Sequence, residues 1–121
     1  MTKFSSLLAA LALAGCYSMP HAQVSAQGGV LVGPNGMTLY TFDRDVAGSG
    51  KSACNGPCAT NWPPLTAATA PGGDGYSLVR RDDGTQQVAY KGKPLYYWSK
   101  DAKPGDKTGD GVNNVWHAAT P

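Results

Sequence analysis

Two cysteines four residues apart form the most reactive pair in the chain. Cys54 and Cys58 enclose a short loop, and in an oxidising compartment such a pair is expected to form a disulfide. A loop this short stabilises a fold by only about 2 kcal/mol. If reduced, the two thiolates could instead bind a soft metal such as copper, with His117 or Met37 as a third ligand. A disulfide is therefore expected, with a copper or thiol-redox site as the alternative.

Side chains suited to catalysis are scarce. His117 is the only histidine after His21, the chain has no Glu, and it has neither a Gly-x-Ser-x-Gly elbow nor a His-Glu-x-x-His helix. Ten Lys and Arg against eight Asp give a net charge of +2 without a basic run, which disfavours nucleic-acid binding. We expect a protein that is not an enzyme, needs no cofactor and binds no nucleic acid.

A loop near the C-terminal end of the sequence is rich in oxygen ligands. Asp101, Asp106, Asp110 and Asn113 lie within it, but their spacing is not that of an EF-hand calcium loop. A solvated turn is expected there, with weak calcium binding as the alternative and no metal site predicted.

A ten-residue pattern occurs twice in the chain. Residues 36–45 and 92–101 both read Gly-x-x-Leu-Tyr-x-aromatic-x-basic-Asp, at an offset of 56. The aromatic and acidic positions are Tyr40, Phe42 and Asp45 in the first copy and Tyr96, Trp98 and Asp101 in the second.

Alternation along a strand places each Tyr and its aromatic neighbour on one face. Leu39 and Leu95 then face the other side. We expect a core cluster of aromatic rings, with Asp45 and Asp101 accepting backbone N–H groups in the turns that follow. The alternative is an exposed aromatic platform for a glycan or a peptide.

The elements that must position these residues are short strands. With 16 Gly and 9 Pro in 121 residues, the composition favours an all-β fold of hairpins and meanders. Strands are predicted at residues 30–32, 37–42, 76–80, 86–90, 95–98 and 115–118, and one helical turn at residues 57–62. Two pseudo-repeats, residues 29–70 and 75–121, are expected to share one core in a single domain of residues 29–121, because an isolated hairpin is only marginally stable.

The N-terminal residues have the pattern of an export signal. Residues 4–14 are apolar but would rise only about 16 Å as a helix, against a hydrocarbon core of about 30 Å. The sequence Leu13-Ala14-Gly15-Cys16 resembles the lipobox of bacterial lipoproteins. That resemblance implies a signal peptide of residues 1–15, a lipidated Cys16 as the first mature residue, and residues 16–28 as a flexible tether. The alternative is cleavage after Ala22 or Ala26, which would leave a soluble secreted or periplasmic protein.

The body of the chain resembles a known family. The two Tyr-x-(Phe/Trp/Tyr)-x-x-Asp motifs flank Cys54-x-Gly56-x-Cys58-Ala59-x-x-Trp62-Pro63-Pro64-Leu65 and precede Trp116, and together they resemble the bacterial secreted-repeat lipoproteins. The resemblance covers nearly all of residues 28–121. It implies an exported all-β module whose molecular function is not established for the family.

These observations predict a bacterial cell-envelope lipoprotein whose body is a non-enzymatic binding or structural module. Its expected partners are a membrane, through the lipid anchor, and an envelope protein or a glycan. Since Tyr17 and not Asp follows Cys16, resemblance to other lipoproteins places the anchor in the outer membrane if the cell has two membranes.

Overall fold

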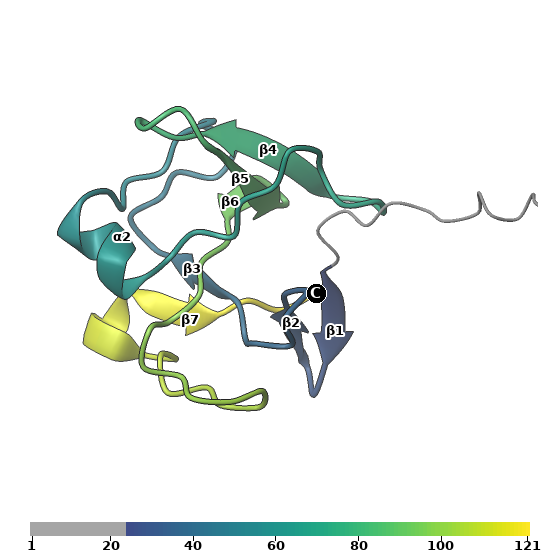
Figure 1. Ribbon diagram of the computed structural model, residues 1–121, viewed down its shortest axis with the longest axis vertical. Coiled ribbons are helices and arrows are strands. Elements are labelled where there is room, and N and C mark those ends of the chain that lie inside the picture. The colour runs from purple at the N-terminus through teal and green to yellow at the C-terminus, as the bar shows by residue number, and fades with distance from the viewer. Residues whose placement is uncertain (1–23) are drawn as a thin grey trace, which may run out of the picture.

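The computed structural model describes residues 24–121. Short strands connected by long turns make up most of it (Figure 1). The elements are β1 (Ser25–Gln27), β2 (Val30–Val32), β3 (Tyr40–Phe42), α2 (Pro57–Asn61), β4 (Tyr76–Arg80), β5 (Gln86–Tyr90), β6 (Lys93–Pro94), the 3-10 turn η1 (Val112–Asn114) and β7 (Trp116–Ala118). None of these helices is long and apolar enough to cross a membrane, a finding that covers only the described residues.

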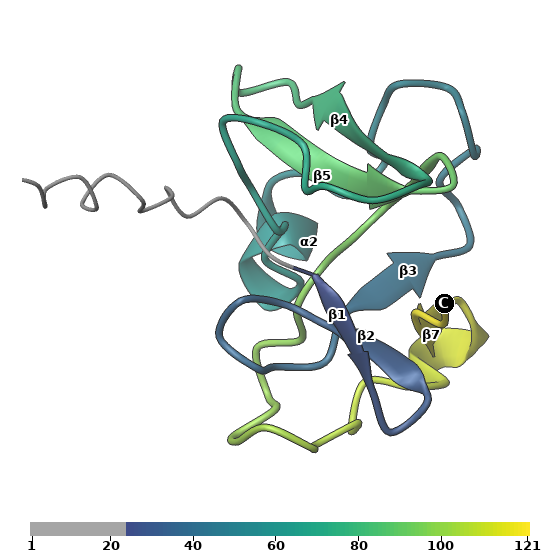
Figure 2. The ribbon, with the colours of Figure 1, turned by 90° about the vertical axis from the view of Figure 1, so that its right-hand side faces the viewer.

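The strands pair antiparallel in three small sheets. Their orders are β1-β2, β3-β7 and β4-β5-β6. The β4-β5 hairpin lies at the top of both ribbon views, with β3 and the β1-β2 hairpin below it (Figures 1 and 2). The all-β class predicted from composition and strand pattern is confirmed.

The two halves repeat the same backbone hydrogen bonds. In the first half, Leu39 N donates to Leu31 O at 2.9 Å, and in the second half Leu95 N donates to Val88 O at 2.9 Å. These bonds continue the ladder beyond the named strands. The two halves are therefore copies of one small β unit.

The copies meet at the two tyrosines of the motif. Tyr40 N donates to Tyr96 O at 2.7 Å, and Tyr96 N donates to Tyr40 O at 3.0 Å. Tyr40 and Tyr96 are equivalent positions of the repeat, and each donates to the other the same backbone bond that it accepts. The two halves are therefore related at this point by an approximate two-fold axis. The motif strands thus lie at the interface between the halves.

The core has two parts that lie on opposite faces of the motif strands. Leu39 and Leu95 belong to an aliphatic cluster, whereas Tyr40 and Tyr96, the next residues, belong to an aromatic one. The alternation predicted for these strands is thus observed. The aliphatic members are Leu31, Leu39, Leu65, Val88, Leu95 and Ala119, and the aromatic cluster contains Tyr40, Cys54, Trp62, Tyr96 and Trp116.

Strand β1 corrects the predicted tether. Residues 25–27 were expected to belong to a flexible segment of residues 16–28, but they pair with Val30–Val32 through a tight turn at Gly28 and Gly29, whose φ angles are +62° and +85°. All three β1 side chains are exposed, so no apolar alternation revealed the strand. The predicted signal peptide, Cys16 and the rest of the tether lie outside the described residues.

Two other strand predictions need correction. The third meander strand is Lys93–Pro94 and not residues 95–98, because Tyr96 leaves β5 to pair with Tyr40 and Pro64. The predicted strand at 37–42 is divided, since Thr38 bridges to Val32 whereas residues 40–42 pair with β7. The helical turn at 57–62 and the last strand are found within one residue of their predicted limits.

Candidate functional site

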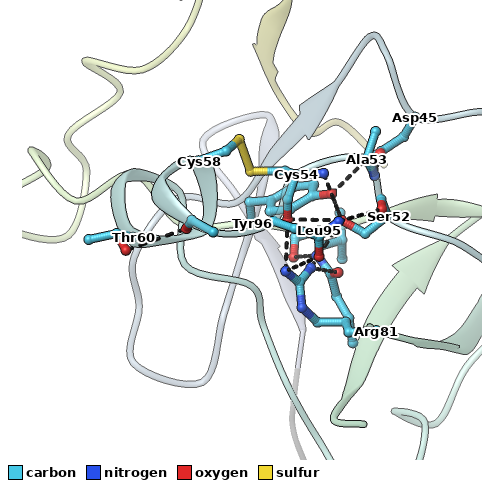
Figure 3. The surroundings of a disulfide bond; sticks show 12 residues. Asp45, Ser52, Ala53, Cys54, Cys58, Thr60, Arg81, Leu95 and Tyr96 are labelled. Atoms are coloured by element: carbon cyan, nitrogen blue, oxygen red, sulfur yellow. Dashed lines mark hydrogen bonds between the residues drawn. A yellow bond between two sulfur atoms is a disulfide. The ribbon is translucent and has the colours of Figure 1, made fainter. Parts of the chain in front are cut away.

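The two cysteines of the body form a disulfide. Cys54 and Cys58 are joined, with their Cα atoms 5.2 Å apart, across the start of α2 (Figure 3). The predicted disulfide is confirmed, and in this state neither sulfur is a thiolate. Residues 24–121 contain no cluster of three His, Cys, Asp or Glu side chains arranged to hold a metal ion. A soft-metal site would first require reduction of this bond.

Each motif tyrosine hydrogen-bonds the aspartate of the other motif. Tyr40 Oη donates to Asp101 Oδ2 at 2.6 Å, and Tyr96 Oη donates to Asp45 Oδ2 at 2.6 Å. Both tyrosines are fully buried. A phenol donating to a carboxylate in such surroundings makes a short, charge-assisted bond. The motif residues thus form two reciprocal hydrogen bonds between the two halves.

The second oxygen of each carboxylate holds the loop that follows its motif. Asp45 Oδ1 accepts from Ala53 N at 2.6 Å. Asp101 Oδ1 accepts from Thr108 N at 3.0 Å and from Thr108 Oγ1 at 2.6 Å. Each aspartate therefore joins a tyrosine of the other half to a loop of its own half.

Four aromatic rings lie face to face across the interface between the halves. Phe42 lies 4.1 Å from Trp116, Trp116 lies 3.8 Å from Trp62, and Trp62 lies 3.9 Å from Trp98, between ring centroids. We call these four rings the aromatic stack. Its order follows the two-fold relation, with the two motif aromatics outside and the other two rings inside.

The motif tyrosines close the sides of the aromatic stack. Tyr40 meets Trp62 edge to face at 5.5 Å, and Tyr96 meets Trp116 in the same way at 5.2 Å. Edge-to-face contact is a favoured geometry, worth about 0.5–1.5 kcal/mol for each pair. Four of the six rings are buried, and only Phe42 and Trp98, at the ends of the stack, are half-buried. Most of the predicted cluster is therefore core and offers no platform to a ligand.

Burial determines the protonation of the tyrosine–aspartate pairs. Burial, together with the hydrogen bond to Asp101, raises the pKa of Tyr40 far above its usual value. Burial and the bond to Asp45 do the same to the pKa of Tyr96. The pKa of Asp45 is also raised by burial, although the bonds from Tyr96 and Ala53 and the charge of Arg81 oppose that shift. Both phenols therefore stay protonated at any physiological pH.

A buried arginine joins the disulfide loop to the second half. Arg81 Nη2 donates to Cys54 O at 2.7 Å, and Nη1 donates to Gln87 Oε1 at 2.7 Å and to Ser52 Oγ at 3.0 Å (Figure 3). The hydroxyl of Ser52 lies 2.6 Å from Tyr96 Oη. A polar chain thus runs from the guanidinium through a serine and a tyrosine to the carboxylate of Asp45.

Sequence reasoning missed this arginine. Arg81 stands beside Asp82 and Asp83, a run typical of a solvated turn, yet it is 5 % exposed. The signal that could have found it is Gln87, an amide side chain inside β5 that is fully buried next to Val88. A buried amide requires a hydrogen-bonding partner.

The carboxylates of the oxygen-rich loop are used in local turns. Asp106 Oδ2 accepts from Ala102 N at 2.8 Å and from Lys103 N at 3.1 Å. Asp110 Oδ1 accepts from Ala118 N at 2.9 Å. The hydrogen bond and charge of Lys103 lower the pKa of Asp106. The geometry is that of a solvated turn.

A cleft of about 340 Å³ lies beside the β3-β7 sheet. Within it, His117 Nε2 lies 2.9 Å from Asp43 Oδ2, and both side chains are about half exposed. The lining residues are Thr41, Asp43, Tyr90, Lys91, Lys93, Leu95 and His117–Pro121. The lining combines charges of both signs, hydroxyls and apolar side chains, which suits a polar ligand.

Comparison with known proteins finds one family. The model of a family described as a secreted repeat of unknown function matches residues 22–66 and residues 77–120. The two matches correspond to the two structural halves, and the first includes β1. Neither the curated proteins nor the solved structures contain a match to this chain.

Proposed function

Because the chain belongs to the family of secreted repeats of unknown function, we propose that it is a non-enzymatic binding module of the bacterial cell envelope. In this proposal a lipid on Cys16 holds it to a membrane, which is the outer membrane in a cell that has two. The body then presents a rigid surface to a glycan or to another envelope protein.

The reciprocal bonding of the motif is the observation that carries this proposal. Asp45 and Asp101 are the acids of the repeated motif, and each accepts a hydrogen bond from a tyrosine on one oxygen and from a loop N–H group on the other. A general base must lie within hydrogen-bond reach of a substrate proton, whereas the donors that reach these two carboxylates belong to the chain itself. In this proposal the motif residues stabilise the fold, and a ligand is bound by other residues at the surface.

The cleft beside the β3-β7 sheet is the binding site in this proposal. Thr41 and His117 reach it from the paired strands β3 and β7, and Asp43 directly follows β3. Lys93 reaches it from β6. Side chains on strands of a rigid core are well suited to position a hydroxyl-rich ligand. We expect a glycan to be recognised there by hydrogen bonds to these four side chains.

Intact mass spectrometry of the protein extracted from membranes tests the anchor. The expected mass is that of residues 16–121 with acyl chains on Cys16, and a Cys16→Ser variant should leave the membrane fraction, because the acyl chains supply the attachment. An unmodified N-terminus at Gln23 or Gln27 would contradict the anchor and leave the binding module untouched.

An NMR titration with soluble peptidoglycan fragments tests the binding site. Changes in NMR chemical shift are expected at Thr41, Asp43 and His117. A Lys93→Ala variant should bind the fragments more weakly. The matched control is Lys51→Ala, an exposed lysine outside this cleft, which should bind as the wild type does. Shifts confined to other surfaces would refute the assignment of the cleft.

A further inference from the structure

We propose that the aromatic stack and the two tyrosine–aspartate pairs form a relay that moves an oxidising equivalent from the surface to a buried tyrosine. The reactant is a small one-electron oxidant of the radical class. This activity is independent of the ligand-binding role proposed above, and it uses residues that role does not need.

The oxidant reaches the relay at one end. Trp98 is half-buried and is the most exposed of the three tryptophans, since Trp62 and Trp116 are 4 % and 3 % exposed. The other end of the stack is Phe42, whose benzene ring is much harder to oxidise than an indole. Lys100 Nζ lies 6.0 Å from the ring centroid of Trp98, and its charge disfavours a positive charge that stays on this ring. The relay therefore begins at Trp98 and leads inward.

Transfer inward follows direct ring contact. Trp98 stacks on Trp62 at 3.9 Å, and Trp62 stacks on Trp116 at 3.8 Å with only 3° between the ring planes. The Trp98 and Trp62 planes are inclined by 26° and still overlap. Overlap of stacked π systems at these distances delocalises the radical cation over neighbouring indoles. Tyr40 and Tyr96 each touch an inner indole through a ring edge. Each tyrosine is one contact away from the stack.

The tyrosines trap the oxidising equivalent because a proton acceptor is in place. Oxidation of a phenol releases its proton, and Asp45 Oδ2 lies 2.6 Å from Tyr96 Oη. Asp101 Oδ2 has the same position beside Tyr40. Since burial raises the pKa of both phenols, no phenolate forms in advance, and the proton must leave together with the electron.

One of the two branches of the relay ends at Tyr96 and Asp45. The oxidant radical takes one electron from Trp98 and is reduced to its anion. An electron from Tyr96 restores the indoles, and the phenolic proton passes to the carboxylate of Asp45. The products are the reduced oxidant, neutral tryptophans, a neutral tyrosyl radical and a protonated aspartic acid.

Pulse radiolysis with the azide radical, applied to the full chain with its disulfide intact, tests the relay. We expect the tryptophanyl absorption to decay while the tyrosyl absorption rises, at a rate independent of protein concentration. The double variant Tyr40→Phe/Tyr96→Phe should lose this rise. Its matched control is Tyr76→Phe/Tyr90→Phe, a ring pair of the β4-β5 hairpin outside the stack, which should keep it. A rise that survives in the first variant, or a wild type whose tryptophanyl radicals persist, would overturn the proposal.

The proton acceptor has its own test. Asp45→Asn/Asp101→Asn should slow the transfer by about 100-fold or more, the lower end of what a positioned proton acceptor contributes. Because this variant could fail to fold, the wild type is also measured in heavy water, where a transfer that moves a proton must be slower. The absence of a solvent isotope effect would refute the role of the aspartates.

Discussion

At the scale of single residues, the two motif aspartates show how a short pattern can carry a long-range contact. Asp101 Oδ2 accepts from a tyrosine 61 positions earlier, and its Oδ1 accepts from Thr108, seven positions later. Asp45 repeats this arrangement with Tyr96 and Ala53. The carboxylate is required because only an ionised group with two acceptor oxygens satisfies both donors without a donor of its own.

Replacement of Asp101 by Asn tests this argument. We expect Asp101→Asn and Tyr40→Phe each to lower the free energy of unfolding by about 1.5–3 kcal/mol, since each removes a bond to a charged group. The double variant should cost less than the sum, with a coupling of about 0.5–3 kcal/mol. Urea denaturation measures all three. Asp82→Asn, at an exposed turn position, is the control and should change the free energy of unfolding little. If the losses from Asp101→Asn and Tyr40→Phe simply add in the double variant, the contact between these two side chains is contradicted.

The buried tyrosines also predict a response to alkali. The pKa values of Tyr40 and Tyr96 are raised, and burial raises that of Tyr97 to about 12. Because the unfolded chain ionises near the ordinary value of about 10, stability from these groups is complete below that pH and is lost as the pH rises above it. We expect phenolate absorption from these residues to appear only together with loss of the near-ultraviolet circular dichroism. Full ionisation near pH 10 in a folded protein would contradict this expectation.

At the scale of elements, the helix α2 within residues 24–121 is too short to be stable by itself. Helix α2 has five residues and no buried side chain, far fewer residues than an isolated helix needs. The Cys54–Cys58 disulfide closes its first turn, and Arg81 binds the carbonyl of Cys54. These two tertiary links, and not helix propensity, keep the segment in place.

Gly109 shows the same dependence in the loop before β7. A Cβ atom at this position would lie 2.9 Å from atoms of both Trp62 and Trp98, within the aromatic stack. We expect Gly109→Ala to lower the free energy of unfolding by about 1–3 kcal/mol, as overpacking does. Gly72→Ala is the matched control, because nothing lies within 4 Å of its Cβ, and it should be neutral or slightly stabilising. Equal changes in thermal stability for the two variants would contradict close packing of Gly109 against Trp62 and Trp98.

At the scale of the whole molecule, the two-fold relation explains the strand that sequence reading missed. In the second half β4 precedes β5, and in the first half β1 precedes β2 in the equivalent place. The predicted first half began at residue 29 and therefore lacked a counterpart to β4. The duplication itself was the available signal, because a repeat with one strand missing indicates that the boundary was placed too late.

The crossed bonds predict that neither half folds alone. A chain that ends at Ala70 and one that begins at Gly75 each contain one tyrosine and one aspartate of the motif, but not two that pair. We expect each fragment to lack cooperative unfolding, since half of the core is absent. Mixing the two should restore the circular dichroism of the stacked tryptophans. A cooperative transition in either fragment would contradict the shared core.

Most of the elements and the faces of the motif strands follow from the sequence alone, whereas β1, the division of residues 37–42 and the position of β6 do not. Alternation placed Leu39 and Tyr40 on opposite sides of one strand, the spacing of Cys54 and Cys58 predicted their disulfide, and the repeated motif revealed the two halves. The first two properties are local, because they depend on side-chain period and on distances of a few residues along the chain. The repeat is found by comparing two stretches of the sequence with each other.

Which side chains meet follows from the way the two halves pack against each other in the folded chain. Tyr40 is close in sequence to Asp45, but its phenol bonds Asp101, because the two motif strands pair with each other and direct each tyrosine toward the loop of the other half. The burial of Arg81 and the order of the aromatic stack follow from the same approach of the two halves. Because the two motifs have the same pattern, the sequence does not show whether a tyrosine bonds the aspartate of its own motif or that of the other motif. The folded structure shows that it bonds the other one.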